Sequence, residues 1–167
     1  VGNILSSEGG DDSVFKPVFD DIVAELHGAP LDLYVMSHEH LDHVQGLLYL
    51  ATKVYPGDEF AQKLSVRDAW LTASAEDGYY ERHPDAKKIF ETIATFLANA
   101  PPSVSLAYRS VLDSNDPRRT KECVDFLKGL AANTHYVYRG VDVSGKHSFR
   151  EAQFSIWEPE EDVSTYD

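Results

Sequence analysis

Residues 35–46, VMSHEHLDHVQG, place three histidines and one aspartate within six positions, directly behind an apolar run. Their pattern is H-x-H-x-D-H, made by His38, His40, Asp42 and His43. A hydrophobic core does not require such a cluster, because ionisable side chains are rarely buried without a partner. Imidazole and carboxylate groups are common metal ligands. The pattern therefore predicts a metal site, and the fold must bring these four side chains together.

The apolar run at 31–36 has the length and composition of a strand covered on both faces. In a regular strand, the side chains at 38, 40 and 42 would share one face, while that at 43 would point to the other. All four can converge only if the chain leaves strand geometry near Leu41. We therefore expect a strand-to-helix loop, at the carboxyl end of the strand, where the sites of open α/β sheets lie. The N-terminus of the following helix also attracts anions.

Helical and strand patterns alternate along the rest of the chain. Apolar spacing predicts helices over 14–26, 43–55, 84–100 and 117–132. Short runs rich in β-branched, aromatic and apolar residues predict strands over 66–72, 104–108, 135–140 and 149–159, and 74–84 is expected to be a polar loop. This alternation predicts an α/β layered domain, in which helices cover a sheet. No internal linker divides residues 1–167, so we expect one domain.

Composition limits the partners of the chain. Its 167 residues are 43% hydrophobic, which suits a globular domain with a core. The 15 basic and 28 acidic residues give a net charge of −13, which disfavours general attraction to nucleic acid or anionic membranes. No apolar run approaches the roughly 18 residues of a membrane span. The single cysteine, Cys123, cannot form an internal disulfide, so a reducing compartment, the cytosol, is expected.

The stretch LDLYVMSHEHLDHVQGL resembles the signature of the metallo-β-lactamase superfamily, whose members are di-metal hydrolases with an αββα sandwich fold. The resemblance implies that His38 and His40 bind a first metal, and that Asp42 and His43 bind a second. It also implies that Asp42 orients the attacking water, and that two zinc ions occupy the site, with manganese or iron as alternatives. The spacing between the motif and AQFSIWEPEED further resembles the ComEC-like branch, which includes the nuclease domain of DNA-uptake competence proteins.

The chain also departs from the superfamily pattern. Members normally add a further histidine, a bridging aspartate after a later strand, often in a Gly-Asp pair, and a last histidine. Here the Gly-Asp pair at 57–58 comes too early and is typical of a turn, while residues 140–142 lack the required spacing. His135, and after it His147, lie in the right part of the chain for a further metal ligand, although both suit a solvated strand edge or hairpin equally. We therefore expect an incomplete sandwich, a fragment of a longer hydrolase domain.

Three functions are compatible with the motif. The first is hydrolysis of phosphodiester or nucleic-acid substrates by a metal-bound hydroxide, which forms at neutral pH because the metal lowers the pKa of water. The second is hydrolysis of a lactam, lactone, thioester or other small ester, which the acidity of the chain mildly favours. The third is a non-catalytic subunit of a homo-oligomer or larger assembly, in which the histidines brace the fold. Sequence alone does not separate the third, because a catalytic zinc needs an open coordination position.

Two aromatic features carry further expectations. Asp77, Tyr79 and Tyr80 follow the strand predicted over 66–72 and could line a cleft, although a solvated loop with aromatic anchors is the simpler interpretation. Trp70 and Trp157 are expected in the core, since large aromatic side chains bury the most apolar surface.

Overall fold

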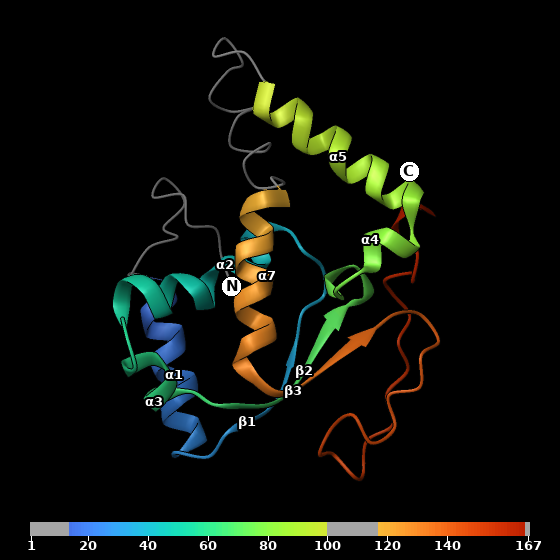
Figure 1. Ribbon diagram of the computed structural model, residues 1–167. Helices are drawn as coiled ribbons and strands as arrows, with labels where there is room; N and C mark the ends of the chain where they lie inside the picture. Colours follow the sequence, from blue (N-terminus) through green and yellow to red (C-terminus); the bar gives the residue numbers. More distant parts are fainter. Residues whose placement is uncertain (1–13, 100–116, 166–167) are drawn as a thin grey trace.

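The computed structural model describes residues 14–99 and 117–165, except the side chains of Asp42 and of residues 117–119. Three parallel strands form one sheet in the order β1-β2-β3 (Figure 1). They are β1 (Leu31–Val35), β2 (Val66–Thr72) and β3 (Ala131–Val137). The predicted α/β class is confirmed at this level. The strand predicted over 104–108 lies outside the described residues.

Helices connect and cover the strands, as the alternating pattern predicted. The α-helices are α1 (Phe15–Leu26), α2 (Leu41–Tyr49), α3 (Glu59–Lys63), α4 (Tyr79–Arg82), α5 (Pro84–Asn99) and α7 (Pro117–Leu130). A π-helical turn, η2 (Leu50–Val54), extends α2, and η3 (Ala73–Ala75) and η4 (Val163–Thr165) are 3-10 turns. Parallel strands require such crossover connections, because a tight hairpin cannot join them.

The central strand, β2, sets the position of the carboxyl edge of the sheet. In the register, Trp70 of β2 lies opposite Val35 of β1 on one side and His135 of β3 on the other. Strand β1 ends at Val35, whereas β2 continues to Thr72. Every residue of β2 except Arg67 is buried, as expected of a central strand that is covered on both faces. The residues that follow β1 therefore lie beside the last residues of β2.

The main core lies between one face of β2 and two helices. Ala69 and Leu71 pack against Leu41 and Val44 of α2, and against a buried face of α7 that contains Cys123, Val124 and Leu127. Full burial of a valine or leucine side chain contributes about 1.5–3 kcal/mol to the stability of the fold. A second cluster joins α1 to η2, α3 and the start of β2 through Phe15, Phe19, Leu50, Tyr55, Phe60, Leu64 and Val66.

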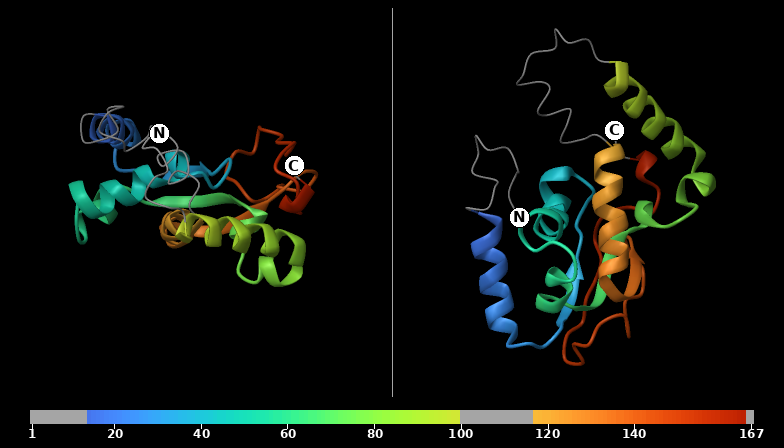
Figure 2. Two further views of the ribbon diagram at one scale, coloured as in Figure 1. Left: turned by 90° about the horizontal axis from the view of Figure 1, so that it is seen from above. Right: turned by 60° about the vertical axis from the view of Figure 1, so that its left-hand side comes forward.

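The chain after β3 covers the opposite face of the sheet. Trp70 packs there with Val137 and Val143, and its indole N–H donates a 2.7 Å hydrogen bond to the carbonyl of Lys146. Seen edge-on in the left view of Figure 2, this segment lies on one side of the sheet, and α5 and α7 lie on the other. The burial of Trp70 confirms the prediction for that residue.

Two predictions for this segment are wrong. Residues 149–159 do not form a strand: two backbone hydrogen bonds, from the amides of Arg139 and Gly140 to the carbonyls of Pro159 and Ile156, join them to the residues after β3, and these do not make a regular ladder. Trp157 is 76% exposed rather than buried. Within the described ranges the structure contains one three-stranded sheet, and the αββα sandwich is not shown. None of the described helices is long and apolar enough to cross a membrane.

Candidate metal centre

Three of the four motif residues lie together at the carboxyl end of β1. The ring centroids of His38 and His43 are 4.0 Å apart, and those of His38 and His40 are 4.8 Å apart. His40 is the N-cap of α2, with an extended backbone, and its carbonyl accepts hydrogen bonds from the amides of His43 and Val44. The predicted strand-to-helix loop is thereby confirmed. The helical turn brings His43 back to the side where His38 lies.

The orientation of the rings decides what the cluster can bind. The hydroxyl of Ser37 lies 3.0 Å from Nδ1 of His38, a contact that fixes the ring in the way that outer partners orient metal-binding histidines. Within the part of the chain that the structure describes, no group of three or more His, Cys, Asp or Glu side chains has the arrangement that would hold a metal ion. Coordination would therefore require the imidazoles to turn toward a common point.

Glu39, which the sequence analysis did not single out, anchors the histidine loop to the central strand. Its carboxylate accepts a 2.6 Å hydrogen bond from the hydroxyl of Thr72 and a second one from the hydroxyl of Ser74. Thr72 is the last residue of β2 and is buried. The signal in the sequence was an acidic residue between two histidines, together with two hydroxyl residues at the end of the next strand.

The motif opens on a cavity of about 990 Å³ at the carboxyl edge of the sheet. Its polar end contains His38, Glu39 and His40 of the loop, with Thr72 and Ser74. The other walls come from α5 and the chain after β3, and they are mostly apolar: Trp70, Ile89, Phe90, Ile93, Val137, Ile156, Pro159 and Val163. Of the described residues, no lysine or arginine lines this cavity. The arrangement suits a ligand with one polar group and an apolar remainder.

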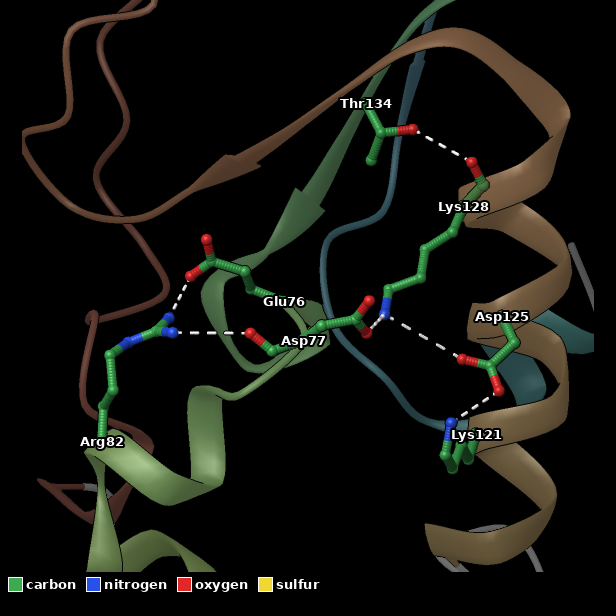
Figure 3. A network of polar contacts seen from close by, with 7 residues as sticks. All are labelled: Glu76, Asp77, Arg82, Lys121, Asp125, Lys128 and Thr134. Carbon is green, nitrogen blue, oxygen red and sulfur yellow. Dashed lines mark hydrogen bonds and ion pairs between the residues drawn. The ribbon is translucent and has the colours of Figure 1, made fainter.

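A smaller cavity of about 260 Å³ lies between the turn that follows β2 and helix α7. Figure 3 shows its charged rim, in which Lys128 binds Asp77 at 2.6 Å and lies 4.0 Å from Asp125. Lys121 also pairs with Asp125. These two lysines and two aspartates thus neutralise one another. Four residues line both cavities: Glu39, Ser74, Tyr80 and Phe90.

The ion pair of Lys128 and Asp77 shifts the pKa values of both groups. Its hydrogen bond to Lys128 holds the pKa of the Asp77 carboxyl below its ordinary range. Burial lowers the pKa of Lys128, but the hydrogen bond to Asp77 and nearby charges together raise it. Both groups are therefore charged over a wide range of pH.

The residues after β2 combine the two alternatives that the sequence left open. Asp77, Tyr79 and Tyr80 line the smaller cavity, so the predicted cleft is present. Tyr79 is also a buried aromatic anchor, with its ring stacked on His83 at 4.3 Å. This stretch was expected to be a loop, but residues 79–82 form the short helix α4, in which the amides of Arg82 and His83 donate to the carbonyls of Gly78 and Tyr79.

His135 and His147 are both partly buried and contact other side chains. The ring of His135 lies beside the buried carboxylate of Asp68, with Nε2 3.4 Å from Oδ1. The ring of His147 contacts Phe154 and Phe149 and the edge of Trp70. His135 is opposite Trp70 in the register, and His147 contacts the ring of Trp70, so both lie near the chain after β3 that covers this face of the sheet. The motif histidines lie instead at the carboxyl end of β1, in contact with one another.

No protein-family model, curated protein or solved structure matches this chain. The resemblance carried by the motif therefore stays a prediction. The function has to be inferred from the residues at the carboxyl edge of the sheet.

Proposed function

We propose that the chain carries the metal centre of a hydrolase, with the H-x-H-x-D-H residues as the metal ligands. The observation that carries this proposal is the contact of three motif imidazoles at the carboxyl end of β1, where His38 and His40 line the 990 Å³ cavity. Imidazole nitrogen is a good ligand for zinc and iron, so the donor set fits the expected metals. When bound, the metal would supply a water with a pKa near 7 and polarise the scissile group.

The residues of the chain would divide the remaining work. His38 and His40 would hold the first metal, and His43 with Asp42 the second, as the motif predicts. Glu39 would keep the loop in place through its hydrogen bonds to Thr72 and Ser74. An anchor of this kind limits the conformational freedom that would otherwise be lost on ligand binding.

Two substrate classes follow from the sequence, and the cavity favours one of them. Phosphodiesters, including nucleic acid, are favoured by the ComEC-like resemblance. An anionic phosphodiester would enter a cavity whose lining includes the acidic residues Glu39 and Glu158, with no lysine or arginine among its described lining residues. The net charge of −13 adds repulsion at longer range. Uncharged lactams, lactones, thioesters or other small esters fit this environment better.

The larger context belongs to the same proposal. Residues 1–167 would form part of an αββα sandwich, and the chain would act in the cytosol. A non-catalytic subunit of an assembly is the alternative, in which the histidines would bind metal without turnover.

The proposal can be tested directly by measuring the metal content of the chain. The chain is purified, loaded with zinc, dialysed, and analysed for metal per chain, in parallel with His38→Ala and His40→Ala. Each substitution removes one imidazole, so we expect zinc at the first site to be lost. The control is His27→Asn, at the C-cap of α1, where asparagine tolerates the left-handed backbone with φ 49°. Equal zinc in all four proteins would disprove the proposed centre.

A further inference from the structure

One wall of the large cavity is an apolar stripe that remains exposed. Ile89 and Ile93 of α5 are 45% and 43% exposed, and both line the cavity. They are four residues apart, so they lie on one face of the helix. Val35, at the end of β1, is 54% exposed and lines the same cavity. Large apolar side chains grouped in this way mark a surface that binds something apolar.

The polar end of the cavity is next to this stripe. Val35 precedes the histidine loop by three residues, and His38, Glu39 and His40 line the cavity with it. A cavity of about 990 Å³ is at the upper end of the range for small-molecule sites, about 300–1,000 Å³. It therefore has room for a polar reacting group and for an extended apolar chain.

We propose that the cavity binds an uncharged ester, or its lactone or thioester equivalent, with its carbonyl at His38 and His40 and its apolar acyl chain along Ile89 and Ile93. This inference rests on the proposed hydrolase function. In the reaction, water adds to the acyl carbon, the bond from that carbon to the leaving oxygen or sulfur breaks, and the proton of the water passes to the leaving group. The products are a carboxylic acid and an alcohol or thiol, and no oxidant or reductant takes part.

Charge identifies the class of occupant. Glu39 and Glu158 are the carboxylates of the lining, and the cations that lie nearby, Lys121 and Lys128, line the other cavity and are paired with Asp125 and Asp77. Among the described lining residues, an anionic chain along Ile89 and Ile93 would thus have no lysine or arginine to pair with, whereas an uncharged acyl chain needs no such partner. Each methylene that is buried should raise kcat/KM about threefold to fourfold.

The test uses the zinc-loaded chain and p-nitrophenyl esters of butyrate and octanoate, with bis(p-nitrophenyl) phosphate for comparison. We expect kcat/KM for octanoate to exceed that for butyrate by on the order of a hundredfold. In Ile93→Ser, the octanoate value should fall about tenfold and the butyrate value by much less, because its acyl chain is shorter. Ile22→Ser is the matched control, because Ile22 is 42% exposed on α1 and lies outside the cavity lining.

A binding measurement keeps the inference separate from catalysis. Octanamide is not an ester substrate, and Trp70, which lines the cavity and is buried, reports its entry through tryptophan fluorescence. We expect saturable binding with and without zinc, weakened by Ile93→Ser and not by Ile22→Ser. If the chain binds zinc and cleaves the phosphodiester, but shows neither octanamide binding nor a preference for octanoate, the acyl site is disproved and the hydrolase function stands. If octanamide binds while zinc does not, the cavity assignment holds and the hydrolase function fails.

Discussion

The carboxylate of Glu39 accepts a 2.6 Å hydrogen bond from the hydroxyl of Thr72, and this contact joins the histidine loop to the last residue of the central strand. The two residues are 33 positions apart in the sequence. Thr72 is only 3% exposed, so its hydroxyl has little access to water. The loop that carries His38 and His40 is therefore anchored from within the sheet.

Glu39→Ala should destabilise the fold by about 1–3 kcal/mol, because it leaves the buried Thr72 hydroxyl without this acceptor. Glu39→Gln should lose less, since its amide oxygen can still accept the hydrogen bond. Urea unfolding gives the free energies, and Glu158→Ala is a control at another glutamate of the cavity lining. A free energy of unfolding for Glu39→Ala within error of the parent would show that the contact contributes nothing.

Asp42→Ala should suppress turnover by about 10²-fold or more and leave the fold intact, because the motif assigns its carboxylate to the reacting water rather than to the core. The measurements are kcat/KM on ester and phosphodiester substrates and the circular dichroism spectrum. Asp21→Ala, an exposed position on α1, is the control. Parental activity of the Asp42 variant would remove that residue from the mechanism.

Local pattern predicted the elements that position the site, and failed where structure depends on distant partners. The strand over 66–72 was predicted from its short run of β-branched, aromatic and apolar residues, and β2 has these bounds. Residues 149–159 alternate like a strand, but a strand also needs a neighbour, and this segment receives only two backbone hydrogen bonds from 139–140. Trp157 belongs to this segment, and it is exposed because no further layer covers the segment in the described structure.

The contact of the motif histidines was also predicted, whereas their role as metal ligands stays a prediction. The spacing of His38, His40 and His43 predicted their convergence, because it required a strand to end and a helix to begin between them. The role of Glu39 was not predicted, since its partners Thr72 and Ser74 come from the next strand. Contacts between neighbouring strands depend on register, which the sequence of one strand does not fix.

The ion pair of Asp77 and Lys128 should make stability depend on pH in a defined direction. Because the pKa of Asp77 is lowered on folding, its contribution is present above its ordinary pKa of about 3.9 and is lost as the pH falls through the folded value. The pKa of Lys128 is raised, so its contribution is present below about 10.4 and is lost as the pH rises through the folded value. The pair therefore stabilises the fold between these limits.

Asp77→Asn is the corresponding variant. Its melting temperature should lie below that of the parent near neutral pH, and the two should converge in acid, as the pH falls through the lowered pKa of the parent carboxyl. The difference should be small, because the Asp77 side chain is 97% exposed and solvent screens the pair. A gap that stays constant from acid to neutral pH would assign the effect to something other than charge.

The hydroxyl of Tyr79 ties the end of the described chain to the body of the domain. It donates a 2.8 Å hydrogen bond to the carbonyl of Glu161 and accepts a 2.9 Å hydrogen bond from the amide of Val163, a residue that lines the large cavity. Tyr79→Phe removes both contacts and keeps the buried ring, so it should cost about 0.5–1.5 kcal/mol for each hydrogen bond. Hydrogen exchange at 161–165 should become faster, because these amides would open without unfolding of the sheet. Tyr80→Phe is the control, because the Tyr80 ring packs on Phe90 of α5 at 4.8 Å. This variant should leave exchange at 161–165 unchanged.

Because Val163 forms part of the cavity wall, Tyr79→Phe should also weaken octanamide binding. Parental binding combined with faster exchange would show that this wall does not contact the ligand.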